Sequence, residues 1–187
     1  KMKVINLHQE EQETIRLAIG NNRQAQQMIY NKHAPKMLSV CRQYIKDIQF
    51  AEDLMITSFM KVFVNLEKFE NKGSFEGWMR RIMINECISY IRVHKKVSFL
   101  EDEFYAETGF DASESNYNVD EIQFMIDNLP EGYKLIFNLF AIDGYKHQEI
   151  ATMLNISEGT SKSQLFQARK MLQEQIIKLK NYGHGIK

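Results

Sequence analysis

The sequence predicts an all-α protein made of two small helical domains joined by an acidic linker. Three observations support this fold class. Proline and glycine are scarce, with 2 and 9 residues among 187, and straight-chain residues, which lose little rotamer freedom in a helix, are abundant. Apolar residues recur at three- and four-residue steps, as they do on one face of a helix. Between residues 98 and 119 this periodicity fades into acidic sequence that contains Ser and Gly.

Four helical segments are predicted in the N-terminal half, over residues 10–19, 23–45, 51–69 and 74–94. In the last segment an inward-facing apolar stripe is expected, formed by Phe75, Trp78, Met79, Ile82, Ile88 and Ile91. Just before it, Gly73 can end the preceding helix and Ser74 can cap the next. Pro35 lies inside the second segment and should kink or split it near Ala34.

Residues 97–118 are predicted to form an interdomain linker, because the stretch is too long for an ordinary connection within a compact domain. The linker separates domains at residues 2–96 and 119–182. The C-terminal domain should hold four helices. A short one ends at Asn128, a second starts at the favoured first-turn residue Pro130 and ends before Gly144, and two more cover 147–154 and 158–179.

Within the C-terminal domain, residues 147–172 predict a helix-turn-helix corner with Ile150, Leu154 and Ile156 on its inner face. Asn155 tolerates the left-handed backbone of a tight turn, and Ser157 can cap the second helix. Along that helix a buried stripe is expected, made of Leu165, Ala168, Leu172, Ile176 and Leu179. The residues expected to point outward, near the end that enters the major groove, are Glu158, Thr160, Ser161, Lys162, Gln164 and Arg169.

The formal net charge is zero, but the charges are unevenly distributed. Residues 72–96 hold six Lys or Arg against two acids, and residues 158–180 hold five against two. No Lys or Arg occurs between residues 97 and 133, where acidic residues accumulate. Two basic blocks around an acidic stretch indicate two polyanion-binding surfaces. Solvated helix faces with a soluble linker would give the same pattern.

Composition also argues against several classes of protein. Cys41 and Cys87 lack a CxxC pair and a histidine at metal-ligand spacing, so we expect two reduced, buried thiols and no metal site. No apolar run approaches the roughly 18 residues of a membrane span, and no apolar signal region is evident, so we expect a cytoplasmic protein. The five histidines are scattered, and no nucleophile–base pair or phosphate loop occurs. We therefore expect neither an enzyme nor a bound cofactor.

Two long segments carry the motifs of a known protein family. Residues 129–172, LPEGYKLIFNLFAIDGYKHQEIATMLNISEGTSKSQLFQARKML, contain the strings Glu-Ile-Ala and Gly-Thr-x-Lys-Ser. With these strings they resemble the region-four domain of bacterial RNA polymerase sigma factors of the extracytoplasmic-function (ECF) type. This corner alone would also fit the output domain of a response regulator. Residues 50–96 resemble region two, with an Ala-Glu-Asp-Leu opening and the stretch GSFEGWMRRIMIN, and they favour the sigma factor. The resemblance implies an alternative sigma factor that binds core polymerase, directs it to specific promoters and helps melt the minus-ten element.

Region two of this family binds the clamp helices of the polymerase β′ subunit. The resemblance places that contact on residues 53–63, with Asp53, Leu54, Phe59 and Phe63 as candidate contacts. The family commonly has Gln-Glu where this chain has Ile56 and Thr57, a departure that removes two polar partners from the interface.

Region two also opens the minus-ten element and holds its single strand, which requires a pocket for an extruded base. By resemblance, polar and basic side chains of the loop 71–74 and the following helix bind this DNA: Asn71, Lys72, Ser74, Arg80, Arg81, Asn85, Arg92, Lys95 and Lys96. Trp78 could stack on a base, but its place in the apolar stripe favours a core role.

Region four reads the minus-thirty-five element as a duplex and touches the flap of the β subunit. The resemblance gives as readers Thr160, Lys162, Ser163, Gln164, Phe166, Gln167 and Arg169. Two positions that are usually basic are Gln164 and Gln167 here, and Ser161 replaces a usual valine, so weak, salt-sensitive duplex binding is expected. The implied partners are core RNA polymerase, promoter DNA and an anti-sigma factor, with no membrane insertion and no small-molecule substrate.

A conventional helix-turn-helix transcriptional regulator is the alternative interpretation. Such a protein needs a dimerisation or effector domain and binds a palindromic operator. Residues 2–96 resemble neither a ligand pocket nor a receiver domain nor a coiled coil, which argues against this alternative.

Overall fold

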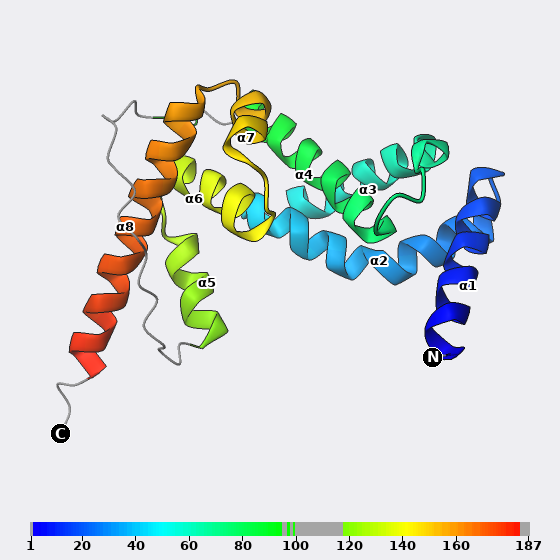
Figure 1. Cartoon of the computed structure of the whole chain (residues 1–187), viewed down its shortest axis with the longest axis horizontal. Helices are drawn as coiled ribbons and strands as arrows, with labels where there is room; N and C mark the ends of the chain where they lie inside the picture. The colour runs from blue at the N-terminus through cyan, green and yellow to red at the C-terminus, as the bar shows by residue number, and fades with distance from the viewer. Residues whose placement is uncertain (1, 95–96, 98, 100–117, 184–187) are drawn as a thin grey trace. The chain divides into compact units, whose positions relative to one another are not determined.

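The computed structural model of the chain describes residues 2–94, 97, 99 and 118–183 (Figure 1). The chain divides into two compact units, Lys1–Val93 and His94–Lys187. Every regular element among the described residues is helical, which confirms the predicted all-α class. Most of the segment predicted as a linker, residues 97–118, lies outside the described residues, so the domain limits 2–96 and 119–182 stay predictions.

The first unit contains four α-helices and one 3₁₀ turn. They are α1 (Met2–Ile19), α2 (Arg23–Tyr44), α3 (Ile48–Val64), the 3₁₀ turn η1 (Leu66–Lys68) and α4 (Phe75–His94). Helix α2 packs against both α1 and α3, and η1 packs against α1. All four predicted helices are present, although α1 begins eight residues earlier than its predicted start at residue 10. The third, predicted over residues 51–69, is found as α3 over residues 48–64 followed by the 3₁₀ turn η1.

Side-chain caps define where the helices of this unit begin. The Asn22 side chain accepts a hydrogen bond from the Ala25 amide at 3.0 Å, and Asp47 Oδ1 accepts from the Gln49 amide at 2.9 Å. Ser74 Oγ accepts from the Gly77 amide at 3.3 Å at the start of α4, as predicted. Each cap supplies an acceptor for an amide that has no partner within the helix.

Pro35 does not split α2, which runs without a break from Arg23 to Tyr44. Of the predicted kink or division near Ala34, the division therefore does not occur. A proline removes one backbone donor and crowds the carbonyl of the residue four positions earlier, which here is Asn31. Both residues are exposed, so water can bond to that carbonyl. The buried side chains on either side of Pro35, including Ile29 and Met37, hold the two halves of the helix in the same core.

The core of the first unit is shared by α2, α3 and α4. Its fully buried side chains include Met37, Val40, Cys41, Phe59, Val62, Leu66, Met79, Met83, Ile84 and Cys87. Both cysteines are free and buried, as predicted, and a hydrogen bond from Cys87 lowers the pKa of the Cys41 thiol. Surface ion pairs tie α4 to its neighbours. Lys36 on α2 contacts Glu76 at 2.6 Å, and Lys61 on α3 contacts Glu86 at 2.6 Å.

The second unit contains the four predicted helices. They are α5 (Val119–Asp127), α6 (Glu131–Phe137), which continues into the π-helical turn η2 (Asn138–Ile142), α7 (His147–Leu154) and α8 (Glu158–Gly183). Helix α8 packs against α5, α6 and α7 (Figure 1). A buried ammonium group, that of Lys134 on α6, forms an ion pair with Asp127 on α5.

The buried stripe predicted along α8 is confirmed only in its first part. Leu165 is 3% exposed and Ala168 0%, whereas Leu172 and Ile176 are half-buried and Leu179 is 44% exposed. The reason is length: α8 has 26 residues, while α5, α6 and α7 have 9, 7 and 8. At about 1.5 Å per residue, the last turns of α8 extend past the helices that could cover them.

Candidate nucleic-acid interface

The loop before α4 is exposed and has an unusual backbone. Residues 70–74 are all exposed, and both Asn71 (φ 55°) and Gly73 (φ 99°) adopt the left-handed conformation. The Lys72 ammonium pairs with the Glu70 carboxylate at 2.6 Å within the loop. Asn and Gly are the residues that adopt positive φ most readily. The loop therefore holds the polar groups of Asn71, Lys72 and Ser74 in the solvent.

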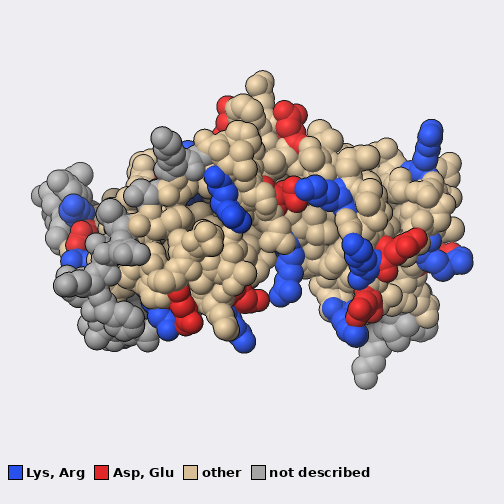
Figure 2. All heavy atoms as spheres, turned by 90° about the horizontal axis from the view of Figure 1, so that it is seen from above, with Lys and Arg blue, Asp and Glu red and all other residues tan. Residues whose placement is uncertain are grey.

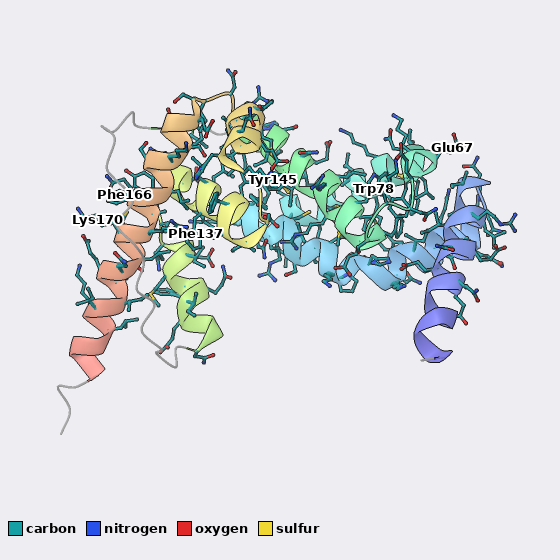
Figure 3. All side chains as sticks on the ribbon, in the orientation of Figure 1. Glu67, Trp78, Phe137, Tyr145, Phe166 and Lys170 are labelled. Carbon is teal, nitrogen blue, oxygen red and sulfur yellow. The ribbon has the colours of Figure 1, made fainter. Side chains whose placement is uncertain are left out.

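An aromatic cluster supports this loop from behind. The rings of Phe69 and Trp78 are 5.6 Å apart, and those of Phe75 and Trp78 are stacked at 5.9 Å. Trp78 is labelled in Figure 3. His33 on α2 meets the edge of Phe75 at 5.8 Å. Trp78 is half-buried, so its ring packs against Phe69 and Phe75 but is not fully enclosed in the core.

The polar face of α4 continues from the loop. Arg81, Asn85 and Arg92 are exposed, and the first two lie one helical turn apart. Arg80 differs, since it is half-buried and its Nη2 donates to Gln43 Oε1 on α2 at 3.4 Å. Lys95 and Lys96, also predicted to bind minus-ten DNA, lie outside the described residues.

The predicted polymerase-binding residues of α3 have different environments. Asp53 is exposed and Leu54 and Phe63 are half-buried, but Phe59 is only 2% exposed. The Phe59 ring packs edge-on against Tyr30 on α2 at 4.9 Å. Phe59 is therefore a core residue in this structure. The sequence pattern did not single out the exposed apolar residues of this helix, which include Met60 at 62% and Val64 at 79% exposure. Their spacing of four and eight residues from Ile56 could have revealed them.

The helix-turn-helix corner in the second unit has the predicted geometry. Asn155 ends α7 with φ 55° and ψ 49°, the left-handed conformation expected for the turn. Ser157 Oγ accepts from the Thr160 amide at 2.9 Å and so caps α8. At the start of α7, Glu149 accepts from the Lys146 amide at 2.8 Å. Because a lysine side chain has no acceptor, the reciprocal half of this cap is missing.

Several residues expected to point outward from α8 are buried in this structure. Thr160 is 8% exposed, Ser161 0%, Ser163 8% and Gln164 1%. The hydroxyl groups of Thr160 and Ser157 lie 2.7 Å apart, and Ser163 Oγ donates to the Thr160 carbonyl at 3.1 Å. The expectation that Thr160, Ser161 and Gln164 face outward is wrong here, partly because short hydroxyl side chains bond back to their own helix.

The exposed charge at this end of α8 belongs to Glu158 and Lys162, which form an ion pair at 2.8 Å. A hydrogen bond from Lys162 holds the pKa of the Glu158 carboxyl below its usual value. Further along, the Arg169 guanidinium lies 5.6 Å from the centre of the Phe140 ring, and Phe166 and Gln167 are half-buried. Among the seven predicted readers, the accessible candidates are therefore Lys162, Phe166, Gln167 and Arg169.

Phe140 and His147 contact residues of α8 in the second unit, and the sequence pattern singled out neither. Their rings are stacked with centroids 4.5 Å apart, and His147 Nδ1 lies 2.9 Å from Ser161 Oγ. His147 therefore links the first turn of α7 to the first turn of α8, and Phe140 provides the ring over which Arg169 lies. Such contacts between separate elements leave no periodic signal in a sequence.

Acidic and basic side chains alternate on the face shown in Figure 2, and neither sign forms a continuous patch there. On that face, positive groups are therefore set among acidic ones. Among the described residues, the ion pairs Lys36–Glu76, Lys61–Glu86 and Lys162–Glu158 join basic and acidic side chains directly. Across the described ranges, no group of three or more His, Cys, Asp or Glu residues could hold a metal ion, and no helix is long and apolar enough to cross a membrane.

Comparison with known proteins assigns both units to one family. The family model for sigma-70 region 2 matches residues 29–97, and that for sigma-70 region 4 matches residues 120–172. The ECF RNA polymerase sigma factor SigM of Bacillus subtilis is 26% identical over 148 residues, which cover 77% of this chain and 90% of SigM. SigW of the same organism is 28% identical over 162 residues, covering 79% and 87%.

A solved structure shares the fold. The sigma factor RpoE of Bartonella quintana, in complex with the anti-sigma factor NepR, aligns with a TM-score of 0.50 at 21% identity and covers 79% of this chain and 94% of its own. Together with the two region matches, these relatives show that the chain belongs to the sigma-70 family and is a sigma factor of the ECF type. It directs RNA polymerase to promoters in transcription initiation.

Proposed function

We propose that the two units divide the work of this sigma factor between three surfaces. Helix α3 binds core polymerase, the loop 71–74 with the polar face of α4 holds single-stranded minus-ten DNA, and the first turns of α8 read the minus-thirty-five duplex. The observation that carries this proposal is the exposed loop with its left-handed Asn71 and Gly73, backed by an aromatic cluster and continued by Arg81 and Asn85.

The minus-ten surface is suited to capturing a base that has left the stack. Extruding a base costs a few kcal/mol of stacking and pairing free energy. A preorganised pocket offsets this cost through hydrogen bonds to the base edge. Asn71, Ser74 and Asn85 supply amide and hydroxyl groups for such bonds, and Arg81 and Arg92 lie where the phosphates would follow α4. Capture would stabilise the open promoter over the closed one, because only the open strand offers the base.

At the minus-thirty-five element, Lys162, Phe166, Gln167 and Arg169 are the accessible readers. Thr160, Ser163 and Gln164 stay predicted contacts, and their use requires a change of surroundings, since buried side chains cannot reach a duplex. With few exposed cations on this helix, we expect weak, salt-sensitive binding of the duplex by this unit alone.

The wider proposal is that the chain is a non-enzymatic factor acting in the cytoplasm, where promoter DNA and polymerase meet. We also propose that an anti-sigma factor holds it inactive. The support is the likeness in fold to RpoE, whose structure contains the anti-sigma factor NepR.

Run-off transcription tests the function directly. Core polymerase from the same species is given a pool of genomic promoters with and without the chain, and new start sites sharing upstream elements are expected. Binding of promoter DNA by the chain without binding of polymerase would favour a conventional helix-turn-helix regulator.

A double variant tests the minus-ten surface. Arg81→Ala/Asn85→Ala should lower open-complex formation by about tenfold or more, measured by permanganate reactivity of unpaired thymines, while core binding stays unchanged. Arg23→Ala removes an exposed charge far along the sequence from α4 and serves as the control.

A further inference from the structure

His33 lies behind the loop 71–74, where three helices of the first unit meet. It belongs to α2 and is only 5% exposed. On one side its Nε2 lies 3.9 Å from a carboxylate oxygen of Glu11 on α1. On the other side its ring meets that of Phe75, the first residue of α4, edge-on at 5.8 Å. A buried imidazole therefore links α1 and α2 to the point where the loop ends and α4 begins.

The ring of Phe75 in turn holds both ends of the loop. Phe69 comes just before the loop and Phe75 directly after it, and their rings are 5.1 Å apart. Trp78, one turn further along α4, contacts both rings. Phe75 is 3% exposed, whereas Phe69 and Trp78 are half-buried, so Phe75 is the most enclosed of the three. A shift of the Phe75 ring therefore moves the ends of the loop, and with them Asn71 and Ser74.

Two ion pairs surround His33 and act on its charge state. On α2, Lys32 pairs with Glu11 of α1 at 2.7 Å. Lys36, also on α2, pairs with Glu76 of α4 at 2.6 Å. Burial, together with the two lysines, lowers the pKa of the imidazole, while the two carboxylates oppose this in part. The ring is therefore neutral near about pH 7, and a proton binds to it only as the pH falls further.

A proton on His33 disturbs its contact with Phe75. An imidazolium that is 5% exposed is costly unless an anion compensates its charge. Among the described residues, Glu11 provides the carboxylate within ion-pair distance, so the charged ring is drawn toward α1. Movement toward α1 weakens the edge contact with Phe75, which then holds the ends of the loop less firmly. The neutral and charged forms of His33 thus favour different arrangements of the loop.

We propose that His33 is a positioning residue for the minus-ten loop, whose neutral ring holds the loop through Phe75 and whose protonation releases it. His33 is buried and does not touch DNA itself. Promoter opening by this chain then declines as the pH falls below neutral, because Asn71 and Ser74 are no longer held in place for the extruded base. This inference rests on the proposed role of the loop 71–74 in binding minus-ten DNA.

Fluorescence of Trp78 tests the link between His33 and the aromatic cluster without DNA. Trp78 is the only tryptophan in the chain, so its emission reports on the cluster alone. In the full wild-type chain this emission should titrate with a midpoint below about pH 6.5. Glu11→Gln removes a carboxylate that raises the pKa of His33, so the midpoint should move to lower pH. Glu13→Gln makes the same charge change at an exposed residue that pairs with Arg16, and should keep the wild-type midpoint.

Two substitutions at position 33 separate the ring from the proton. His33→Phe keeps an aromatic ring beside Phe75 but cannot titrate, whereas His33→Gln lacks both the ring and the charge. Open-complex formation with core polymerase is measured by permanganate reactivity and divided by the value for His33→Phe at the same pH, which removes the polymerase's own pH dependence. This ratio should be near one for the wild type at about pH 7.5 and fall about threefold or more by about pH 5.5. For His33→Gln it should be low at both pH values.

The outcomes distinguish this inference from the proposed function. A Trp78 titration in His33→Gln identical to that of the wild type would overturn the inference and leave the proposed function intact. So would a wild-type ratio that does not change with pH. The comparison of Glu11→Gln with Glu13→Gln needs no variant at position 33, and equal midpoints would also overturn the inference. If Arg81→Ala/Asn85→Ala opened promoters as well as the wild type at neutral pH, the proposed minus-ten surface would fall, and the inference with it.

Discussion

The Lys162 ammonium lies 2.8 Å from a Glu158 carboxylate oxygen, one turn earlier on the same helix. The pair lies at the end of α8 that is proposed to enter the major groove. A phosphate must compete with Glu158 for this lysine, and the carboxylate itself repels DNA. We expect Glu158→Gln to raise the affinity for a minus-thirty-five duplex a few-fold and Lys162→Ala to lower it, with a loss of about one unit of salt slope.

Anisotropy titrations of the full chain with a duplex oligonucleotide at several salt concentrations measure both effects. Glu174→Gln is the control, since Glu174 is exposed on α8 four turns further on and should leave the affinity unchanged. A large loss for Gln164→Ala together with no change for Lys162→Ala would contradict the assignment of roles on this helix.

The local signals in the sequence were sufficient for most of the fold. Asn155, Ser157 and Ser74 have the turn and caps predicted for them, because each depends on one residue's own backbone preference and a donor within three positions. The end of α7 at Leu154 follows directly from the left-handed Asn155. The division predicted at Pro35 does not occur, because buried contacts on both sides of this residue outweigh the local rule.

The site was less predictable, because its arrangement depends on contacts between elements. Whether Phe59 faces polymerase or Tyr30 is decided by the packing of α2, and the periodicity of α3 does not distinguish its two apolar faces. The link between His147 and Ser161 joins residues fourteen positions apart through a turn. Resemblance to a family names positions, but exposure decides which side chains are available at them.

Phe59 gives the second prediction. Its ring is 2% exposed and packs against Tyr30 at 4.9 Å, so Phe59→Ala should lower the free energy of unfolding of the first unit by about 3–5 kcal/mol. Phe59→Leu keeps most of the apolar volume and should cost clearly less. Urea unfolding followed by circular dichroism measures both. If Phe59→Leu abolished core binding without a matching loss of stability, Phe59 would be a polymerase contact as the sequence suggested.

Asn155 gives the third prediction, because its φ of 55° is strained for any residue with an ordinary side chain. Asn155→Ala should destabilise the turn between α7 and α8 by about 1 kcal/mol, while Asn155→Gly should be within about 0.5 kcal/mol of the wild type or slightly more stable. Amide hydrogen exchange across α7 reports this locally, and exchange should be faster only in the alanine variant. Equal exchange in both variants would mean that the turn is held by packing and not by backbone preference.

His33 gives the last prediction, which concerns pH. The side chain is buried beside Phe75, and burial, aided by Lys32 and Lys36, lowers the pKa of the imidazole, with Glu11 and Glu76 opposing this in part. In the unfolded chain the histidine pKa is about 6.5. As the pH falls, the unfolded chain therefore binds a proton at His33 at a higher pH than the folded chain does.

Between these two pKa values the unfolded state holds more protons, so the stability associated with neutral His33 is present above about pH 6.5 and is lost as pH falls towards the folded pKa. His33→Gln cannot titrate. Its free energy of unfolding should fall less between about pH 7.5 and about pH 5.5 than that of the wild type, even if it is lower at neutral pH through loss of the ring contact with Phe75. Parallel pH profiles for the wild type and His33→Gln would show that His33 is not the group responsible.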